Sequence, residues 1–176
     1  MFRPSWILLL ALTPAPLAAA AIARPEPLLL INTSPSEPVG LYVATGQPAR
    51  TGTRIAFRVP APGRAYAARV LPERLRTSVL KTIAAGEGDH VCAGGAHLVI
   101  NGRDVAPIAE RDRRGQALPR WRQCRRLVRG EYFVFSARIP NSFDSRYYGP
   151  VQAGDVIGVY RPLKASGAAP DHPGGA

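Results

Sequence analysis

The chain has 176 residues and a formal net charge of +11, with 46% hydrophobic and 20% charged residues. This length suits one domain with a hydrophobic core and is too short for two large ones. Of its 23 basic residues, only Lys81 and Lys164 are lysines, which excludes a lysine-rich nucleic-acid tail. The two cysteines exclude a disulfide-dense miniprotein and a zinc module built on four cysteines.

Residues 1–24 predict export. No charged residue occurs between Arg3 and Arg24, and this length is close to the roughly 20 apolar residues that cross a bilayer. Small residues near the end of the segment are also typical of a cleaved signal peptide. A retained signal anchor would give an inner-membrane protein with a periplasmic catalytic domain. A cleaved signal peptide would give a periplasmic protein.

The segments that follow are predicted to be mostly strands. Alternating or continuous apolar runs indicate them at Gly40–Ala44, 54–60, Tyr132–Phe135 and Val156–Tyr160. Asn101-Gly102 interrupts the extended run 97–105 and predicts a type I′ hairpin, because both turn residues must take a positive φ. A short helix is expected between Leu71 and Leu80.

The predicted fold class is therefore mainly β, a single antiparallel β domain behind one N-terminal membrane helix. The domain is expected to span 25–164. The Gly/Pro/Ala-rich tail, 165–176, is expected to be disordered.

Cys92 and Cys124 predict a disulfide, because export takes the chain into an oxidising compartment. The alternative is a metal site that also uses His90 or His97, but these residues lack the usual ligand spacing. We therefore expect no metal and no cofactor.

Most common enzyme motifs are missing from the chain. It has no Gly-x-Ser-x-Gly elbow, P-loop, dinucleotide fingerprint or His-Glu-x-x-His motif. Lys81, in the apolar run 78–85, is a candidate for chemistry. Burial would lower the pKa of this lysine and make its amine a general base. The alternative is a lysine that packs its stem on apolar surface and keeps its head in water.

Ser36 lies where Pro35, Pro38 and Gly40 shape the backbone. A serine needs a neighbouring base to become a nucleophile, and Lys81 would supply one, as in Ser-Lys hydrolases. The alternative is that this segment is an ordinary linker between anchor and domain.

A third candidate segment, 139–151, gathers polar side chains in a turn. Asp144 and Arg146 would pair, and Ser142 would aim the amine of Lys81 through a hydrogen bond. The alternative is a solvated turn.

The order of these segments resembles the type I signal peptidase superfamily, and within it the conjugation-type, TraF-like plasmid transfer peptidases. The resemblance runs from Leu30 to Leu163 and implies a signal-peptidase-type fold, with Ser36 as nucleophile and Lys81 as general base. It also implies an oxyanion hole formed by the Ser36 N–H and the Ser34 hydroxyl. The matching motifs are Ser-x-Ser-x-Pro with Gly-Leu-Tyr at 34–42, Leu-Lys and Gly-x-Gly-Asp at 80–89, and Asn-Ser-x-Asp-Ser-Arg at 141–146.

In the third motif, the resemblance implies that Ser142 orients the lysine and that Asp144 and Arg146 are structural. Three positions depart from the superfamily pattern. Glu37 replaces a methionine after the serine, Thr82 replaces the usual arginine after the lysine, and Glu87 stands before Gly88-Asp89 where the pattern has Pro-Gly-Asp. We expect these changes to affect the substrate groove and not the Ser-Lys dyad.

The superfamily's larger insertion is expected to be reduced here to a small Arg-rich segment, 93–129. Eight arginines lie between Arg111 and Arg129. They would contact anionic lipid head groups or an acidic partner, or form a solvated face. An exported domain meets little DNA, so no direct nucleic-acid partner is expected.

The function expected from the residues and the resemblance is a membrane-anchored Ser-Lys endopeptidase. Its substrate would be an exported, pilin-like precursor of a conjugation or type IV secretion system. The resemblance implies that the acyl group can instead pass to the substrate's own amino terminus, giving a cyclic pilin. A general signal peptidase and a non-catalytic exported β assembly factor are the alternatives.

Overall fold

The computed structural model describes residues 26–73 and 78–163. The expected N-terminal membrane helix and the expected disordered tail lie outside the described residues. Within the two described ranges, no helix is long and apolar enough to cross a membrane.

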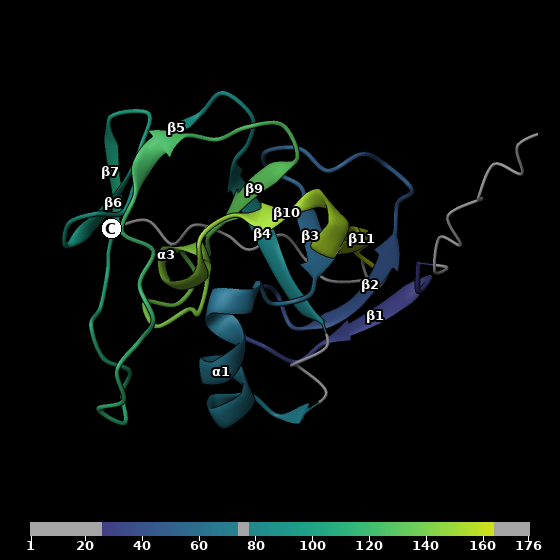
Figure 1. Ribbon diagram of the computed structural model, residues 1–176. Helices are drawn as coiled ribbons and strands as arrows, with labels where there is room; N and C mark the ends of the chain where they lie inside the picture. The colour runs from purple at the N-terminus through teal and green to yellow at the C-terminus, as the bar shows by residue number, and fades with distance from the viewer. Residues whose placement is uncertain (1–25, 74–77, 164–176) are drawn as a thin grey trace, which may run out of the picture.

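A seven-stranded sheet forms the larger part of the fold (Figure 1). Its spatial order is β1-β2-β11-β3-β4-β9-β10, and each pair of neighbours is antiparallel. The strands are β1 (Leu29–Asn32), β2 (Gly40–Ala44), β3 (Arg54–Phe57), β4 (Val79–Ala85), β9 (Glu131–Val134), β10 (Val151–Gln152) and β11 (Val156–Pro162). The prediction of a mainly antiparallel β fold is confirmed, as are the strands expected from the alternating and apolar runs.

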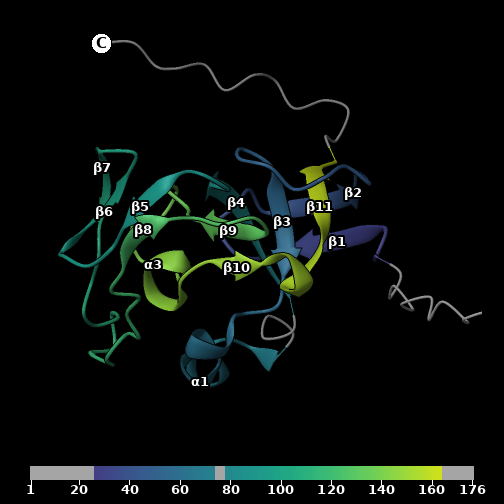
Figure 2. The same ribbon diagram turned by 45° about the horizontal axis from the view of Figure 1, so that its top comes forward.

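A second, four-stranded sheet has the order β7-β6-β5-β8. Its strands are β5 (His90–Cys92), β6 (His97–Ile100), β7 (Arg103–Pro107) and β8 (Cys124–Arg126). Figures 1 and 2 show it at one end of the molecule, away from β1 and β2. It begins at His90, three residues before the expected start of the insertion at 93.

Two local predictions in this second sheet are confirmed. Asn101 and Gly102 join β6 to β7 with φ angles of 49° and 78°, as the predicted hairpin turn requires. Cys92 and Cys124 lie opposite each other on β5 and β8 and form the predicted disulfide. Because the cysteines pair with each other, the alternative metal site is wrong.

Both faces of the larger sheet are covered by apolar side chains. On β3, Ile55 and Phe57 point into a main core that continues into the second sheet, while Ala56 points to a smaller cluster with Tyr42 and Tyr160. This alternation follows from the two-residue period of a strand. Each large apolar side chain that is fully buried contributes about 1.5–3 kcal/mol.

Helix α1 (Ala61–Val70) was not predicted, and its sequence explains why. Proline and glycine occupy the first turn, and its buried residues are Gly63, Tyr66 and Ala67, so the apolar stripe is narrow. Proline is tolerated in a first turn. A side chain at Gly63 would clash, because its Cβ would lie 2.9 Å from the Cβ of Tyr148 in helix α3 (Ser145–Tyr148).

The helix expected between Leu71 and Leu80 can be compared with the structure only at its two ends. Residues 74–77 lie outside the described residues, and Val79 and Leu80 begin strand β4 instead. The β-branched and apolar run from Val79 to Ile83 fits a half-buried strand better than a helix. A single-turn 3-10 helix, η1 (Ala153–Asp155), precedes β11.

Candidate active site

Ser36 lies in a short loop that joins two paired strands of the sheet, β1 and β2. Its segment therefore belongs to the folded domain and is not a linker. Asn32 and Gly40 pair at the mouth of this loop. Asn32 is buried, and its Oδ1 accepts a hydrogen bond from the N–H of Ser34 at 3.0 Å. Its Nδ2 donates to three loop carbonyl oxygens, at 2.9, 3.1 and 2.9 Å: those of Ser34, Glu37 and Pro38. One amide side chain therefore fixes the shape of the loop.

The hydroxyl groups of Ser34 and Ser36 face each other across the loop. Their oxygens are 2.9 Å apart, and the Ser36 N–H also donates to the Ser34 oxygen at 3.4 Å. Ser36 is 1% exposed. The structure thus brings together the two donors that were expected to form an oxyanion hole.

Lys81 lies on β4, opposite Ile55 of β3, and its side chain is on the face that carries the main core. It is 4% exposed, so the interpretation of a lysine whose head reaches water is wrong. Its Nζ donates a hydrogen bond to Ser142 Oγ at 3.0 Å. The structure therefore contains the contact that was expected between Ser142 and the amine of Lys81.

Burial lowers the pKa of Lys81 to about 8, because desolvation disfavours the ammonium form. The carboxylates of Asp144 and Glu37 act in the opposite direction, and Arg146 adds to the lowering. In this state no hydrogen bond joins the two described side chains of Lys81 and Ser36: the amine contacts Ser142, and the Ser36 hydroxyl contacts Ser34.

The segment that supplies Ser142 is buried and is not a solvated turn. Arg146 and Asp144 form a two-pronged ion pair, with Nε–Oδ1 at 2.8 Å and Nη2–Oδ2 at 2.9 Å, and their side chains are 2% and 0% exposed. Arg146 also donates to the carbonyl oxygens of Ser142, at 3.0 Å, and Pro107, at 2.8 Å. The ion pair holds the backbone of Ser142 and, through it, the hydroxyl that contacts Lys81.

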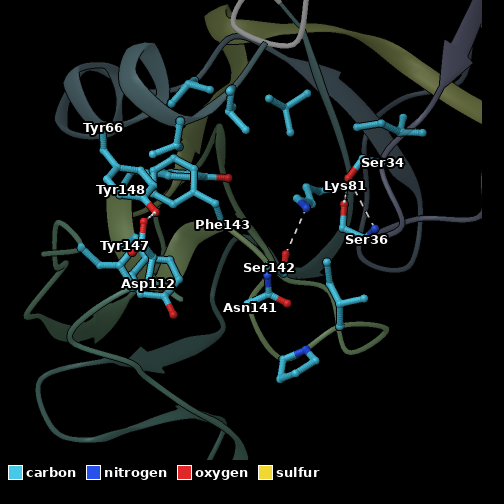
Figure 3. A pocket seen from close by; sticks show the side chains of 18 of the residues that line it. Ser34, Ser36, Tyr66, Lys81, Asp112, Asn141, Ser142, Phe143, Tyr147 and Tyr148 are labelled. Carbon is cyan, nitrogen blue, oxygen red and sulfur yellow. Dashed lines mark hydrogen bonds between the residues drawn. The ribbon is translucent and has the colours of Figure 1, made fainter. Parts of the chain in front are cut away.

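Ser34, Ser36, Lys81 and Ser142 line one side of a single cavity of about 1090 Å³ (Figure 3). The opposite wall in the figure is aromatic, and its ring centroids lie 4.7–5.8 Å apart in the pairs that Phe143 makes with Tyr66, Tyr147 and Tyr148. The cavity therefore offers an apolar wall facing a small set of polar groups, which is the usual character of a binding site.

The arginine-rich segment divides into two parts. Its first three arginines, Arg111, Arg113 and Arg114, line the cavity. Their loop is attached to α1 by Asp112, whose carboxylate accepts a hydrogen bond from the Tyr66 hydroxyl at 2.8 Å.

Three of the later arginines of the segment hold the second sheet to its neighbours. Their shortest contacts are Arg120 to the Gly95 carbonyl at 2.6 Å, Arg125 to Glu131 at 2.7 Å, and Arg126 to the Gly88 carbonyl at 2.7 Å. The segment is therefore not one uniform solvated face.

Sequence reasoning missed two residues of the site. Ser136, just after β9, is buried and donates its hydroxyl proton to the Ser36 carbonyl oxygen, so it fixes the backbone of Ser36 from a distant segment. Tyr148 lines the cavity with a buried hydroxyl that has no hydrogen-bond partner among the described residues. No motif marks either residue, since both act through contacts between distant segments.

No cluster of three metal-ligating side chains occurs in the part of the chain that the structure describes. His97 is half exposed and pairs with Asp104 at 2.8 Å, and His90 is exposed on β5. Neither histidine lines the cavity.

Comparison with known proteins confirms the resemblance. The family model described as signal peptidase, peptidase S26, matches residues 3–163. A plasmid transfer protein TraF of Escherichia coli is 31% identical over 143 residues, which cover 76% of this chain and 81% of the relative. A probable conjugal transfer protein TraF of Sinorhizobium fredii is 28% identical, covering 73% of each chain.

Among solved structures, the crystal structure of a signal peptidase I from Enterococcus faecalis is 24% identical and superposes with a TM-score of 0.38. It covers 64% of this chain and 97% of that chain.

Proposed function

The chain belongs to the signal peptidase family, peptidase S26, and from that premise we propose that it is a membrane-anchored Ser-Lys endopeptidase. Its substrate is an exported, pilin-like precursor of a conjugation or type IV secretion system. The observation that carries the proposal is the buried amine of Lys81, which contacts Ser142 in the cavity that also holds Ser36. The relatives named as plasmid and conjugal transfer proteins support the conjugation context.

In the acylation step, the neutral amine of Lys81 takes the proton of the Ser36 hydroxyl, and Ser36 Oγ attacks the scissile carbonyl carbon. The Ser36 N–H and the Ser34 O–H donate to the oxyanion that forms. A donor placed in this way is worth about 3 kcal/mol of transition-state stabilisation. The tetrahedral intermediate then breaks its C–N bond, and the Lys81 ammonium returns the proton to the leaving amine.

The acyl-enzyme is an ester of Ser36. In hydrolysis, Lys81 takes a proton from a water molecule, whose oxygen attacks the ester carbonyl and releases a linear product. In cyclisation, the substrate's own amino terminus attacks instead. The cyclic product is lighter than the linear one by one water.

Proton transfer requires Lys81 Nζ and Ser36 Oγ to come within hydrogen-bond distance. In the free protein each group has another partner, Ser142 for the amine and Ser34 for the hydroxyl. Catalytic hydrogen bonds often tighten only when substrate binds. We infer that a peptide in the cavity draws Ser34 to the oxyanion and releases the Ser36 hydroxyl toward Lys81.

The cavity also limits the substrate class. Its aromatic wall suits an extended apolar segment of the precursor, and the arginines at 111, 113 and 114 suit a carboxylate beside that segment. The disulfide between Cys92 and Cys124 fits the proposed periplasmic location, because disulfides persist in oxidising compartments. Anchoring in the inner membrane would keep the enzyme near a cleavage site next to the bilayer.

The proposal is tested by incubating the purified full chain with a pilin-like precursor and, separately, with an unrelated secreted preprotein. Mass spectrometry of the products reports cleavage and cyclisation. We expect cleavage of the pilin-like precursor alone. Cleavage of both substrates would instead identify a general signal peptidase, and cleavage of neither would identify a non-catalytic assembly factor.

A further inference from the structure

Glu37 is a buried carboxylate that the proposed reaction does not use. It is 3% exposed, and both of its oxygens are engaged. Oε1 accepts hydrogen bonds from the N–H and the hydroxyl of Thr82, each at 2.8 Å, and Oε2 accepts one from Arg54 Nε at 2.9 Å. Neither Glu37 nor Thr82 lines the cavity, so neither side chain is placed to contact a peptide held there.

The contact is informative because of where its two ends lie in the chain. Glu37 directly follows Ser36, and Thr82 directly follows Lys81. Two of the three positions that depart from the superfamily pattern are therefore in contact with each other, and each of these two is the immediate neighbour of a residue of the proposed dyad. A shift of Glu37 relative to Thr82 would move Ser36 relative to Lys81.

The backbone of β4 explains why a carboxylate is needed at this point. The N–H of Ile83 donates to the Thr53 carbonyl, so the N–H of Thr82 points away from β3. On that side β9 ends at Val134, and the next residue, Phe135, donates its N–H to the Thr82 carbonyl oxygen, whereas the Thr82 N–H donates to Glu37. Glu37 therefore supplies the acceptor that the backbone of the neighbouring segment does not, and a partly buried N–H without an acceptor would be costly.

We propose that Glu37 is a positioning residue that ties the nucleophile loop to the strand bearing the base and keeps Ser36 and Lys81 in register. This inference rests on the proposed function for its kinetic consequence. Its structural consequence, an effect of Glu37 on the environment of Lys81, does not depend on any substrate.

The charged groups that act on Lys81 set the direction of that effect. Glu37 and Asp144 favour the ammonium form, and Arg146 disfavours it. Glu37→Gln removes one favourable carboxylate and leaves Arg54 without its anionic partner. The loss of that carboxylate lowers the pKa of Lys81 further.

The first test is an NMR titration of the full chain labelled at lysine Cε. The chain has two lysines, so the spectrum contains two signals, and Lys164→Arg assigns the signal of Lys81. We expect Glu37→Gln to lower the titration midpoint of Lys81 by roughly half to one pH unit.

Glu131→Gln is the matched control, because Glu131 is also buried on the larger sheet. Its two oxygens bind Arg125 at 2.7 and 2.8 Å at the start of β9, the end of that strand away from Thr82. We expect this variant to leave the midpoint of Lys81 unchanged within about 0.2 units. Equal midpoints in wild type, Glu37→Gln and Glu131→Gln would overturn the inference.

The second test measures cleavage of the precursor. We expect Glu37→Gln to lower kcat roughly tenfold with KM within about twofold, because it disturbs the geometry of the dyad and not the cavity. Glu131→Gln should keep the wild-type kcat. An unchanged kcat in Glu37→Gln would contradict a positioning role.

Thr82→Val is a second variant that tests the same contact from its other end, and it decides the question if Glu37→Gln does not fold. It removes one neutral hydrogen bond to Glu37 and keeps every charge, so kcat should fall about threefold while the midpoint of Lys81 stays constant. A wild-type kcat in this variant would overturn the inference.

If the wild-type chain cleaves no precursor, the proposed function fails, and the NMR titration still decides the link between Glu37 and Lys81.

Discussion

The cavity wall that carries Ser36 and Lys81 differs from the second sheet in the burial and the pairing of the charged side chains in and behind it. Directly behind this wall, charged side chains are buried and paired, as in the pair of Arg146 with Asp144. In the second sheet, charged side chains face solvent, as on β7, where Arg103 and Asp104 are both exposed. The buried pair is joined by two hydrogen bonds of 2.8 and 2.9 Å, which is the geometry of a strong charge-assisted contact.

The difference shows that the density of charge in the sequence is a poor guide to the site. The net charge of +11 comes mainly from arginines, and several of them hold the second sheet to its neighbours. The informative cation is Lys81, because a buried amine can lose its proton near neutral pH and a guanidinium cannot. Substitutions made in one region at a time separate the catalytic role proposed for Lys81 from the structural role of the arginines.

The largest expected effect comes from removing the dyad. Ser36→Ala and Lys81→Ala should each lower the rate of precursor cleavage by about 10⁴-fold or more, since the two groups act as a unit. Far-UV circular dichroism should show the wild-type fold in both variants. Cleavage by either variant at a tenth of the wild-type rate would show that the dyad is misassigned.

Replacing two arginines in turn tests whether the buried ion pair contributes more to stability than the partly exposed one. Arg146→Met leaves Asp144 buried without its partner and should lower the free energy of unfolding by about 3–5 kcal/mol. Arg125→Met removes from the buried Glu131 a partner that is 35% exposed, and Glu131 keeps hydrogen bonds from the Val128 N–H and Gln152, so this variant should lower the free energy of unfolding by only about 1–2 kcal/mol. Urea unfolding measures both, and equal losses would remove the distinction between the two regions.

The pH dependence of cleavage reports the protonation state of Lys81. Its pKa is lowered to about 8, so the neutral amine becomes the main form above that pH. We expect kcat/KM to rise about tenfold per pH unit below this value and to level off above it. A flat profile from roughly pH 6 to 10 would count against Lys81 as the base.

The smallest expected effect concerns the arginines that line the cavity. Arg113→Gln combined with Arg114→Gln should raise KM about threefold to tenfold for a precursor with a carboxylate beside its apolar segment, and the effect should weaken with salt. Arg103→Gln combined with Arg122→Gln removes the same charge from exposed positions outside the cavity lining. Equal KM values for the two double variants would show that the arginine end of the cavity does not bind substrate.

The sequence predicted features that short stretches of chain determine. Alternating apolar residues marked β3, and Asn101-Gly102 marked a hairpin because few other residues take a positive φ at both turn positions. The resemblance of three segments located Ser36, Lys81 and Ser142, which the structure places along one cavity.

Features that depend on contacts between distant segments were not predictable. Helix α1 has a weak apolar stripe and is held by its close approach to Tyr148. Ser136 has no motif and is identified only by its hydrogen bond to Ser36. The partner of Glu37 is 45 positions away in the chain, so its role became visible only when β4 was placed beside the loop.

The most direct test of the account is to identify the covalent intermediate. The full chain is mixed with a pilin-like precursor, quenched in acid, digested and analysed by mass spectrometry. The account predicts an ester between the Ser36 hydroxyl and the acyl part of the precursor, absent from the Ser36→Ala variant. An ester on Ser34 or Ser142 instead, or cleavage that persists in Ser36→Ala, would contradict it.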